Sequence, residues 1–262
     1  MSPSGIEGAG SLKPSEARGL QKALSSPPFR RASMISWVFF DLGGTLLDDS
    51  ALVDAITRAY VDLLNERGFR VTFHEFVEVR DLMIARQEHP LFRSAATTFT
   101  RDPAVSEAIR REVSPRVLGA EVTGQHAFPE AAEILDAASR HAAIGAIANQ
   151  YRTVREVVRR DGLDGFFRAF HVSEEVGVSK PNPAIFELAL REAGCKPQEA
   201  VMVGDRIDFD VEPARSLGFH TVRIKWGPFR NQSPIRAGQR PDAEVATLRE
   251  VPAALDRLAR RG

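Results

Sequence analysis

The stretch that decides the fold is Ser36-Trp37-Val38-Phe39-Phe40-Asp41-Leu42-Gly43-Gly44-Thr45. It is an apolar run that ends at an aspartate, and two glycines follow shortly afterwards. A continuous apolar run is typical of a strand that is buried on both faces, as in a parallel sheet. Glycines after such a run favour a tight loop. The segment therefore predicts a parallel strand whose carboxyl end carries Asp41.

Beyond residue 128, short apolar runs alternate with helical patterns. The predicted strands are 142–148, 166–172, 200–203, 221–225 and 243–246, and the predicted helices are 129–139, 154–161, 183–193, 212–217 and 251–260. Strands that alternate with helices at short intervals are typical of βαβ units. We therefore predict an α/β fold with a doubly wound parallel sheet, a Rossmann-like core covered by helices on both faces.

A long helical segment separates the first predicted strand from the second. Helical spacing predicts helices at 52–67, 73–85 and 104–113, and we expect Pro90 and Pro103 to break the chain between the last two. This segment is far longer than a simple crossover connection.

The excess length predicts a second domain. We expect residues 50–127 to form an inserted helical cap domain, and residues 34–49 and 128–262 to form the α/β core. Open α/β sheets bind their ligands at the carboxyl ends of the strands. An insertion after the first strand would therefore lie over the site as a lid.

The composition restricts the partners and the compartment. The chain has 35 basic and 35 acidic residues, so nothing in its charge favours nucleic acid or an anionic membrane surface. It contains no apolar run of about 18 residues that would predict a membrane span. Cys195 is the single cysteine, which excludes an internal disulfide and fits the cytoplasm. We expect residues 1–33, rich in proline, serine and glycine, to be a disordered extension rather than a signal peptide.

Polar residues follow several of the predicted strands. Asp41 follows the first, Asn149 the second, and Asp205 and Asp210 follow the strand at 200–203, while Lys180 lies in a later connection. Since the ends of parallel strands converge, these groups are expected to meet. Carboxylates on different loops suit Mg²⁺, and a lysine neutralises the charge of a phosphate. An ionised Asp41 could attack phosphorus directly.

These residues resemble the haloacid dehalogenase superfamily, in the subclass that has a helical cap after the first motif. The first family motif is Asp-x-Asp-x-Thr, and here it reads Asp41-Leu42-Gly43-Gly44-Thr45. The second is a strand ending in Ser or Thr, and here it is Ile147-Ala148-Asn149. The third, a Lys-Pro pair, is Lys180-Pro181, and the fourth, Gly-Asp-x-x-x-x-Asp, is Gly204-Asp205-Arg206-Ile207-Asp208-Phe209-Asp210. The resemblance extends from about Ile35 to Arg260, and the motifs occur in the family's order and spacing.

The resemblance implies a role for each matched residue. Asp41 would be the nucleophile, and Lys180 would stabilise the transferring phosphoryl group. Mg²⁺ would be held by Asp41, the main-chain carbonyl of Gly43 and Asp205. The substrate would contact Lys180, Thr45 and Asn149, and Asp210 would orient Lys180 from a second layer. The implied reaction is the hydrolysis of a small phosphorylated molecule by a monomer or a homodimer.

The chain departs from the family pattern at two positions. The family's phosphatases carry a second aspartate two residues after the nucleophile, as the acid for the leaving group and then the base for water, but here that position is Gly43. Proton transfer of this kind contributes about 10²–10⁴-fold to the rate. Its loss predicts a preference for good leaving groups such as aryl or acyl phosphates. Ala148 also replaces a hydroxyl that would bind phosphate.

Two other interpretations remain open. A metal-independent hydrolase close to the dehalogenases would need no acid, because a halide leaves unprotonated; those relatives, however, lack the Gly-Asp motif that this chain keeps at Asp205. A binding or regulatory member of the fold with little turnover would also explain Gly43 and Ala148. Phosphonoacetaldehyde hydrolysis is disfavoured, since it needs a cap lysine and residues 46–128 contain none.

Overall fold

The computed structural model describes residues 35–117 and 119–260. The predicted extension at 1–33 lies outside these described residues. Among the described residues, no helix combines the length and the apolar character that a membrane crossing requires.

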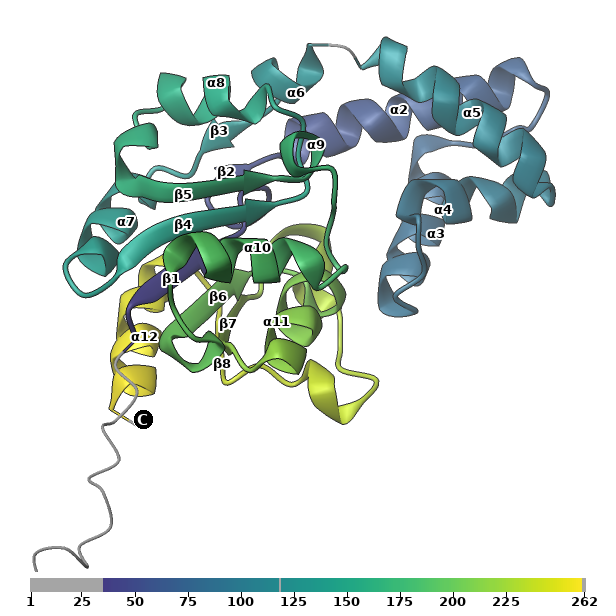
Figure 1. Cartoon of the computed structure of the whole chain (residues 1–262). Helices are drawn as coiled ribbons and strands as arrows, with labels where there is room; N and C mark the ends of the chain where they lie inside the picture. Colours follow the sequence, from purple (N-terminus) through teal and green to yellow (C-terminus); the bar gives the residue numbers. More distant parts are fainter. Residues whose placement is uncertain (1–34, 118, 261–262) are drawn as a thin grey trace, which may run out of the picture.

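Six parallel strands form the central sheet of the described chain (Figure 1). In sheet order they are β5 (Phe167–Val172), β4 (Ala143–Ala148), β1 (Trp37–Phe40), β6 (Ala200–Gly204), β7 (His220–Ile224) and β8 (Ala243–Val245). β1 pairs with β4 on one side and with β6 on the other. The strand order thus reverses beside β1, which is where open α/β sheets bind ligands.

Helices cover both faces of this sheet because its strands are apolar on both sides. Val38 and Phe40 point into one core cluster, whereas Phe39 points into the other. The first face is covered by α7 (Ala131–Ser139), α8 (Val154–Arg160) and α12 (Val251–Ala259), and the second by α10 (Ala184–Ala193) and α11 (Glu212–Leu217). The predicted doubly wound, Rossmann-like α/β core is confirmed.

Shorter segments connect these elements. They are the helix α9 (Ser173–Val176), the 3₁₀ segments Asp164–Phe166, Pro197–Glu199, Gly227–Asn231, Ala237–Gln239 and Leu248–Glu250, and one π-helical turn, Ile207–Val211.

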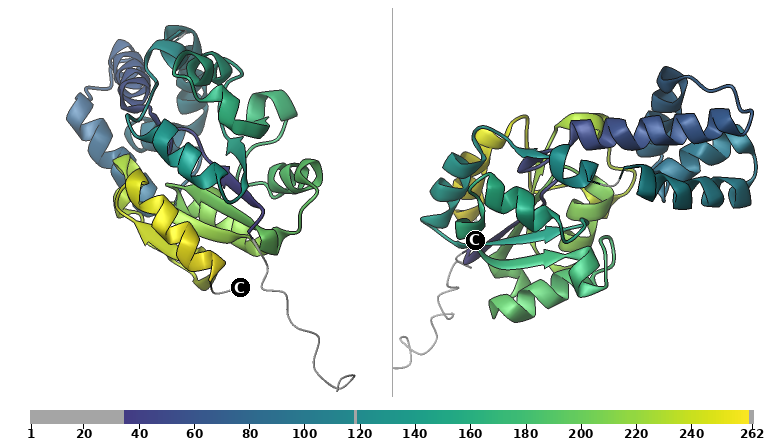
Figure 2. Two further views of the ribbon diagram at one scale, coloured as in Figure 1. Left: turned by 90° about the vertical axis from the view of Figure 1, so that its left-hand side faces the viewer. Right: turned by 90° about the horizontal axis from the view of Figure 1, so that it is seen from above.

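The helices between β1 and β4 form a separate lobe beside the sheet (Figures 1 and 2). They are α2 (Ser50–Glu66), α3 (Phe73–Ala85), α4 (Leu91–Thr100), α5 (Pro103–Arg116) and the short α6 (Ala120–Thr123). Their apolar side chains form a core cluster of their own, in which Tyr60, Phe76 and Phe92 stack on one another. The chain enters and leaves this lobe through two short antiparallel strands, β2 (Leu47–Asp48) and β3 (His126–Ala127).

The helix α4 and the strands β2 and β3 are not expected from the sequence. Pro90 and Pro103 lie at the breaks between α3, α4 and α5, as predicted: Pro90 is the N-cap residue of α4 and Pro103 is the first residue of α5. Proline suits the first turn of a helix, where its missing N–H group has no partner in any case. These two prolines therefore begin helices rather than interrupt them.

Gly145 is required for the packing of β1 against β4. A methyl group built at Gly145 would lie 2.5 Å from two ring atoms of Phe39, which is fully buried. The Phe39 ring stacks on Trp37 and meets Phe219 edge-on, so it has no room to withdraw.

Gly145→Ala should therefore lower the free energy of unfolding by about 1–3 kcal/mol, the usual cost of overpacking a core. Chemical denaturation measures this change. Gly165→Ala is a matched control, because a methyl group there meets nothing within 4 Å. The control should leave stability unchanged or raise it by about 0.4–1 kcal/mol. Equal stability of the two variants would contradict this account of the packing.

Candidate active site

Asp41 lies at the carboxyl end of β1, where the strand order reverses. Its N–H group donates to the carbonyl of Val203 on β6 over 2.8 Å, so the backbone of the two strands remains paired up to this residue. Asp205 follows β6 directly. The loop after Asp41 approaches Asp205 closely: a Cβ at Gly44 would lie 2.6 Å from its Oδ2, and Gly44 also has a φ of +69°. Glycine at position 44 therefore allows both the turn and this approach.

The ammonium group of Lys180 lies between two carboxylates. Its Nζ is 2.8 Å from Asp41 Oδ1 and 2.6 Å from Asp210 Oδ1, and the side chain is almost completely buried. Burial alone would lower the pKa of Lys180, but the charges of Asp210 and Asp41 outweigh burial and raise it. The lysine is thus held as a fixed cation beside Asp41.

Asn149 holds the main chain of Lys180 in place. Its side-chain amide donates to the Lys180 carbonyl over 2.8 Å and accepts from the Lys180 N–H group over 2.7 Å. The sequence predicts that Asn149 binds substrate directly. It borders the same cavity as Asp41, yet both ends of its amide are engaged by Lys180. The observed contacts are those of a residue that positions the lysine.

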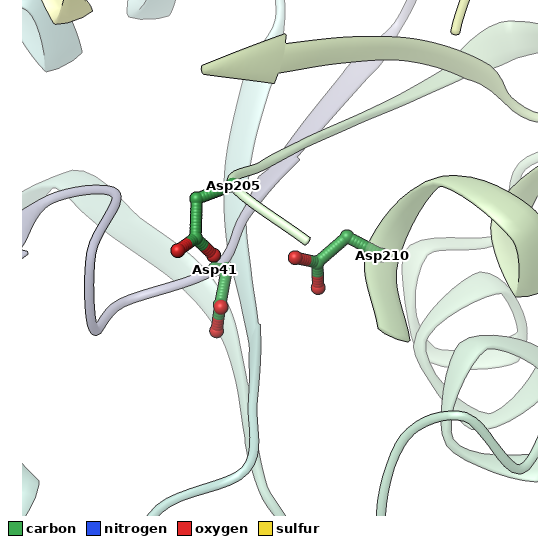
Figure 3. A group of neighbouring side chains, drawn as sticks. All are labelled: Asp41, Asp205 and Asp210. Atoms are coloured by element: carbon green, nitrogen blue, oxygen red, sulfur yellow. The ribbon is translucent and has the colours of Figure 1, made fainter. Parts of the chain in front are cut away.

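Three buried carboxylates meet at this point (Figure 3). Asp41, Asp205 and Asp210 each place an oxygen within 4.8 Å of the others, in an arrangement that could hold a metal ion. Both oxygens of Asp210 are engaged, Oδ1 by Lys180 and Oδ2 by the N–H group of Arg206 over 3.0 Å. These are the contacts of a residue that orients Lys180.

Of the three carboxylates, Asp205 is the one with a buried oxygen, Oδ1, that no hydrogen bond satisfies. Burial and then the charges of Asp210 and Asp41 raise the pKa of Asp205 well above its ordinary range. A buried carboxylate oxygen without a partner is costly unless a cation neutralises it. The donor set around Asp41 and Asp205 therefore fits Mg²⁺, which prefers hard oxygen ligands.

The space beside Gly43 is filled by Asp49. A Cβ at Gly43 would lie 2.5 Å from Asp49 Oδ2 and 3.1 Å from Gln150 Nε2. Burial, and then the charge of Asp41, raise the pKa of Asp49 to about 6. No sequence pattern predicts a role in the site for this carboxylate.

Thr45 lies in the same loop as Asp41 and is buried. Its Oγ1 has no hydrogen-bond partner, and its side chain is 1% exposed. Thr45 does not border the cavity that contains Asp41, whereas Gly43 does.

A cavity of about 550 Å³ contains the site. Of the residues predicted from the sequence, it is bordered by Asp41, Gly43, Asn149, Lys180 and Asp205. A second cavity of about 800 Å³ adjoins it and extends toward the helical lobe, and residues such as Asp49 and Gln150 border both.

Two arginines also border both cavities, Arg80 from α3 and Arg206 from the loop after β6. The guanidinium of Arg206 stacks between the rings of Phe209 and Phe229, at 3.6 and 4.3 Å from their centres. The sequence does indicate Arg206 as a site residue, because it lies inside the fourth motif, whereas no motif or spacing marks Arg80. Arg86 and Arg93, two other arginines of the helical segment that could recognise an anion, border neither of these cavities.

Comparisons with known proteins agree with this geometry. Residues 35–218 match the family model described as haloacid dehalogenase-like hydrolase. The chain is 29% identical over 232 residues to a glyceraldehyde 3-phosphate phosphatase of Methanopyrus kandleri, covering 83% of this chain and 96% of the relative. A phosphoserine phosphatase of Thermus thermophilus is 37% identical over 126 residues, 47% of this chain and 49% of the relative.

One solved structure bears on the alternative hydrolase. A 2-haloacid dehalogenase of Pseudomonas syringae is 26% identical, with a TM-score of 0.54, over 86% of this chain and 99% of that structure.

Asp205→Asn should change both the stability of the protein and its response to metal. Because the pKa of Asp205 is raised in the fold, the stability it contributes is present at pH below its ordinary value and is lost as the pH rises through the raised value. At pH 7 and without metal, the variant should therefore melt at a higher temperature than the parent.

With Mg²⁺ present, the parent should instead melt at a higher temperature than the Asp205→Asn variant. A Mg²⁺ concentration 100 times the Kd should stabilise the parent by about 2.7 kcal/mol and should stabilise the variant little. Thermal melting with and without a chelator measures both effects. Asp136→Asn, at an exposed position of α7, serves as a control that should respond to Mg²⁺ as the parent does. An equal response of the Asp205 variant would exclude this residue as a metal ligand.

Proposed function

The chain belongs to the haloacid dehalogenase-like hydrolases, and from this membership we propose that it is a Mg²⁺-dependent phosphatase of small phosphorylated molecules. The observation that carries the proposal is the position of Lys180, whose ammonium lies 2.8 Å from the carboxylate of Asp41. A fixed cation beside a strand-end carboxylate suits the attack of that carboxylate on a phosphate, since the cation offsets the charge that the two anions share.

The reaction would proceed through a phosphorylated aspartate. The Asp41 carboxylate attacks phosphorus, the bond from phosphorus to the ester oxygen breaks, and an aspartyl-phosphate forms. Water then attacks phosphorus, which releases inorganic phosphate and restores Asp41. Lys180 binds the transferring phosphoryl group, while Asn149 and Asp210 hold the lysine in position.

A divalent metal fits the remaining carboxylates. Asp41, Asp205 and the carbonyl of Gly43 would hold Mg²⁺, and Asp205 has a buried oxygen that is otherwise without a partner. When bound, the ion would reduce the repulsion between the nucleophile and the phosphate.

The substrate is proposed to be a small molecule. A cavity of about 550 Å³ lies within the usual range for small-molecule sites. The two phosphatase relatives act, by their names, on glyceraldehyde 3-phosphate and phosphoserine, which are small phosphorylated metabolites. A balanced net charge argues against nucleic acid as the substrate, and the single cysteine fits a reaction in the cytoplasm.

A dehalogenase-like reaction is the second candidate. The absence of a side chain at Gly43 favours it, because a halide leaves without a proton. The pairing of Asp41 with a buried, uncompensated Asp205 favours the phosphatase, because a haloacid gives that second carboxylate no function.

Asp41→Asn should abolish the hydrolysis of p-nitrophenyl phosphate in the presence of Mg²⁺, with a loss of roughly 10⁴-fold or more, as expected when a nucleophile is removed. This ester is chosen because its leaving group needs no proton. In a rapid-quench experiment, the parent should carry one phosphoryl group on Asp41, located by mass spectrometry of the digested protein. The variant should carry none.

The surface variant Asp136→Asn should keep the parent's rate. Turnover of a 2-haloacid without metal, together with no hydrolysis of the phosphate ester, would contradict the proposal in favour of a dehalogenase. Saturable binding of the ester without Asp41-dependent turnover would instead favour a binding protein.

A further inference from the structure

We propose that Asp49 is the catalytic residue that transfers the proton to and from the leaving group, in place of the side chain absent at Gly43. The inference rests on the proposed phosphatase function. It concerns a carboxylate that the family motifs do not mark, because it lies eight residues after the nucleophile rather than two.

The first observation is the space that the carboxyl group occupies. Asp49 Oδ2 lies 2.5 Å from the point where a Cβ would stand on Gly43. A side chain at position 43 would therefore require the carboxyl group of Asp49 to move from its present position. The site thus has a carboxyl group next to position 43, and Gly43 is the residue that leaves room for it.

The second observation is that Asp49 is not used as its position would suggest. It precedes α2 at the N-cap, where an aspartate usually accepts a hydrogen bond from the first turn of the helix. Asp49 makes no such side-chain bond. The N–H group of Ser50 instead donates to Asp48 Oδ1 over 3.0 Å. The Asp49 carboxyl group therefore does not cap the helix.

The third observation is the place of Asp49 between the two cavities. It borders the cavity that holds Asp41 and Lys180, and it also borders the second cavity, which those two residues do not. Part of the wall of the second cavity is apolar, which suits an organic group, whereas Asp41 and Lys180, the groups proposed to bind the phosphoryl group, border the first cavity alone. The apolar part is formed by Leu52, Ile56, Tyr60 and Phe92. A bound ester would therefore place its phosphoryl group at Asp41 and its organic part in the second cavity. The bridging oxygen then lies at the junction, beside Asp49.

The proposed step is balanced. As Asp41 bonds to phosphorus, the bond from phosphorus to the bridging oxygen breaks, and the proton of the Asp49 carboxyl group passes to that oxygen, which leaves as an alcohol. Asp49, now a carboxylate, then takes a proton from the water that attacks the aspartyl-phosphate. This second transfer restores the proton on Asp49 for the next cycle.

The proposal changes the expected substrate range. Gly43 taken alone predicts selectivity for leaving groups that need no proton. With Asp49 as the acid, the protein hydrolyses alkyl phosphates, whose alkoxide is a poor leaving group, as well as aryl phosphates.

Asp49→Asn tests this directly when two esters are compared. With glycerol phosphate, an alkyl ester, kcat should fall by about 10²–10⁴-fold, the usual contribution of an acid, while KM changes little. With p-nitrophenyl phosphate, formation of the phosphoenzyme should remain close to the parent rate in a rapid-quench experiment. Asn is also a good N-cap residue, so the helix start should be kept, and thermal melting checks this.

Asp48→Asn is the matched control, since it removes the neighbouring charge and retains the cap on Ser50. It should hydrolyse both esters at the parent rate. An equal fall in the rate of phosphoenzyme formation for both esters in Asp49→Asn, or an effect on KM alone, would overturn the proposal and leave Asp49 with a structural or binding role. Unchanged kcat for glycerol phosphate would overturn it as well.

Moving the carboxyl group gives an independent test. Gly43→Asp alone should lower activity, because the new side chain would displace the carboxyl group of Asp49. The double variant Gly43→Asp, Asp49→Gly should recover hydrolysis of glycerol phosphate relative to Asp49→Gly. If a folded double variant does not recover this activity, a carboxyl group at position 43 cannot replace that of Asp49, and the proposed role of Asp49 is contradicted. If the parent forms no phosphoenzyme with either ester, the proposed phosphatase function itself has failed.

Discussion

The buried ammonium group of Lys180 is the interaction on which the rest of the site depends. It joins the end of β1, through Asp41, to the segment that follows β6, through Asp210. Three carboxylates meet here with little access to water, and their mutual repulsion would be severe without a cation. Asn149 fixes the backbone of the lysine from the end of β4, so a third strand takes part. The strand order thus brings these charged groups together, and the ion pairs of Lys180 in turn hold the strand ends in place.

The core of the fold is predictable because each strand has a local pattern in the sequence. Apolar runs such as 37–40 and 200–203 are buried whatever the rest of the chain does, and parallel strand ends must converge. For that reason the sequence alone predicts that Asp41 and Asp205 meet, whereas Lys180, which does not directly follow a strand, is placed there by its motif. The two prolines mark the breaks between the helices, but no local pattern predicts the helix α4 that lies between them.

Contacts between distant segments could not be foreseen. The engagement of the Asn149 amide by the backbone of Lys180 joins residues 31 positions apart, and no periodicity predicts it. The close approach of Asp49 to Gly43 depends on how the chain turns between β1 and α2. The contact between the lobe and the core is equally long-range, and it includes the pairs His89 with Asp208 and Gln87 with Gln239. Such contacts arise from the assembled fold and are not properties of any segment alone.

The N-terminus of α2 ties the proposed catalytic acid to the helical lobe. Asp41 lies at the end of a strand of the sheet, whereas Asp49 immediately precedes α2, the first helix of the lobe, which the β2–β3 pair joins to the core. The two carboxylates are therefore held by different parts of the chain, Asp41 by the sheet and Asp49 by the start of the lobe. A substitution that displaces the start of α2 would thus alter the proposed acid and leave the pairing of Asp41 with Lys180 in place. The fit between lobe and core is in this sense part of the proposed catalytic apparatus.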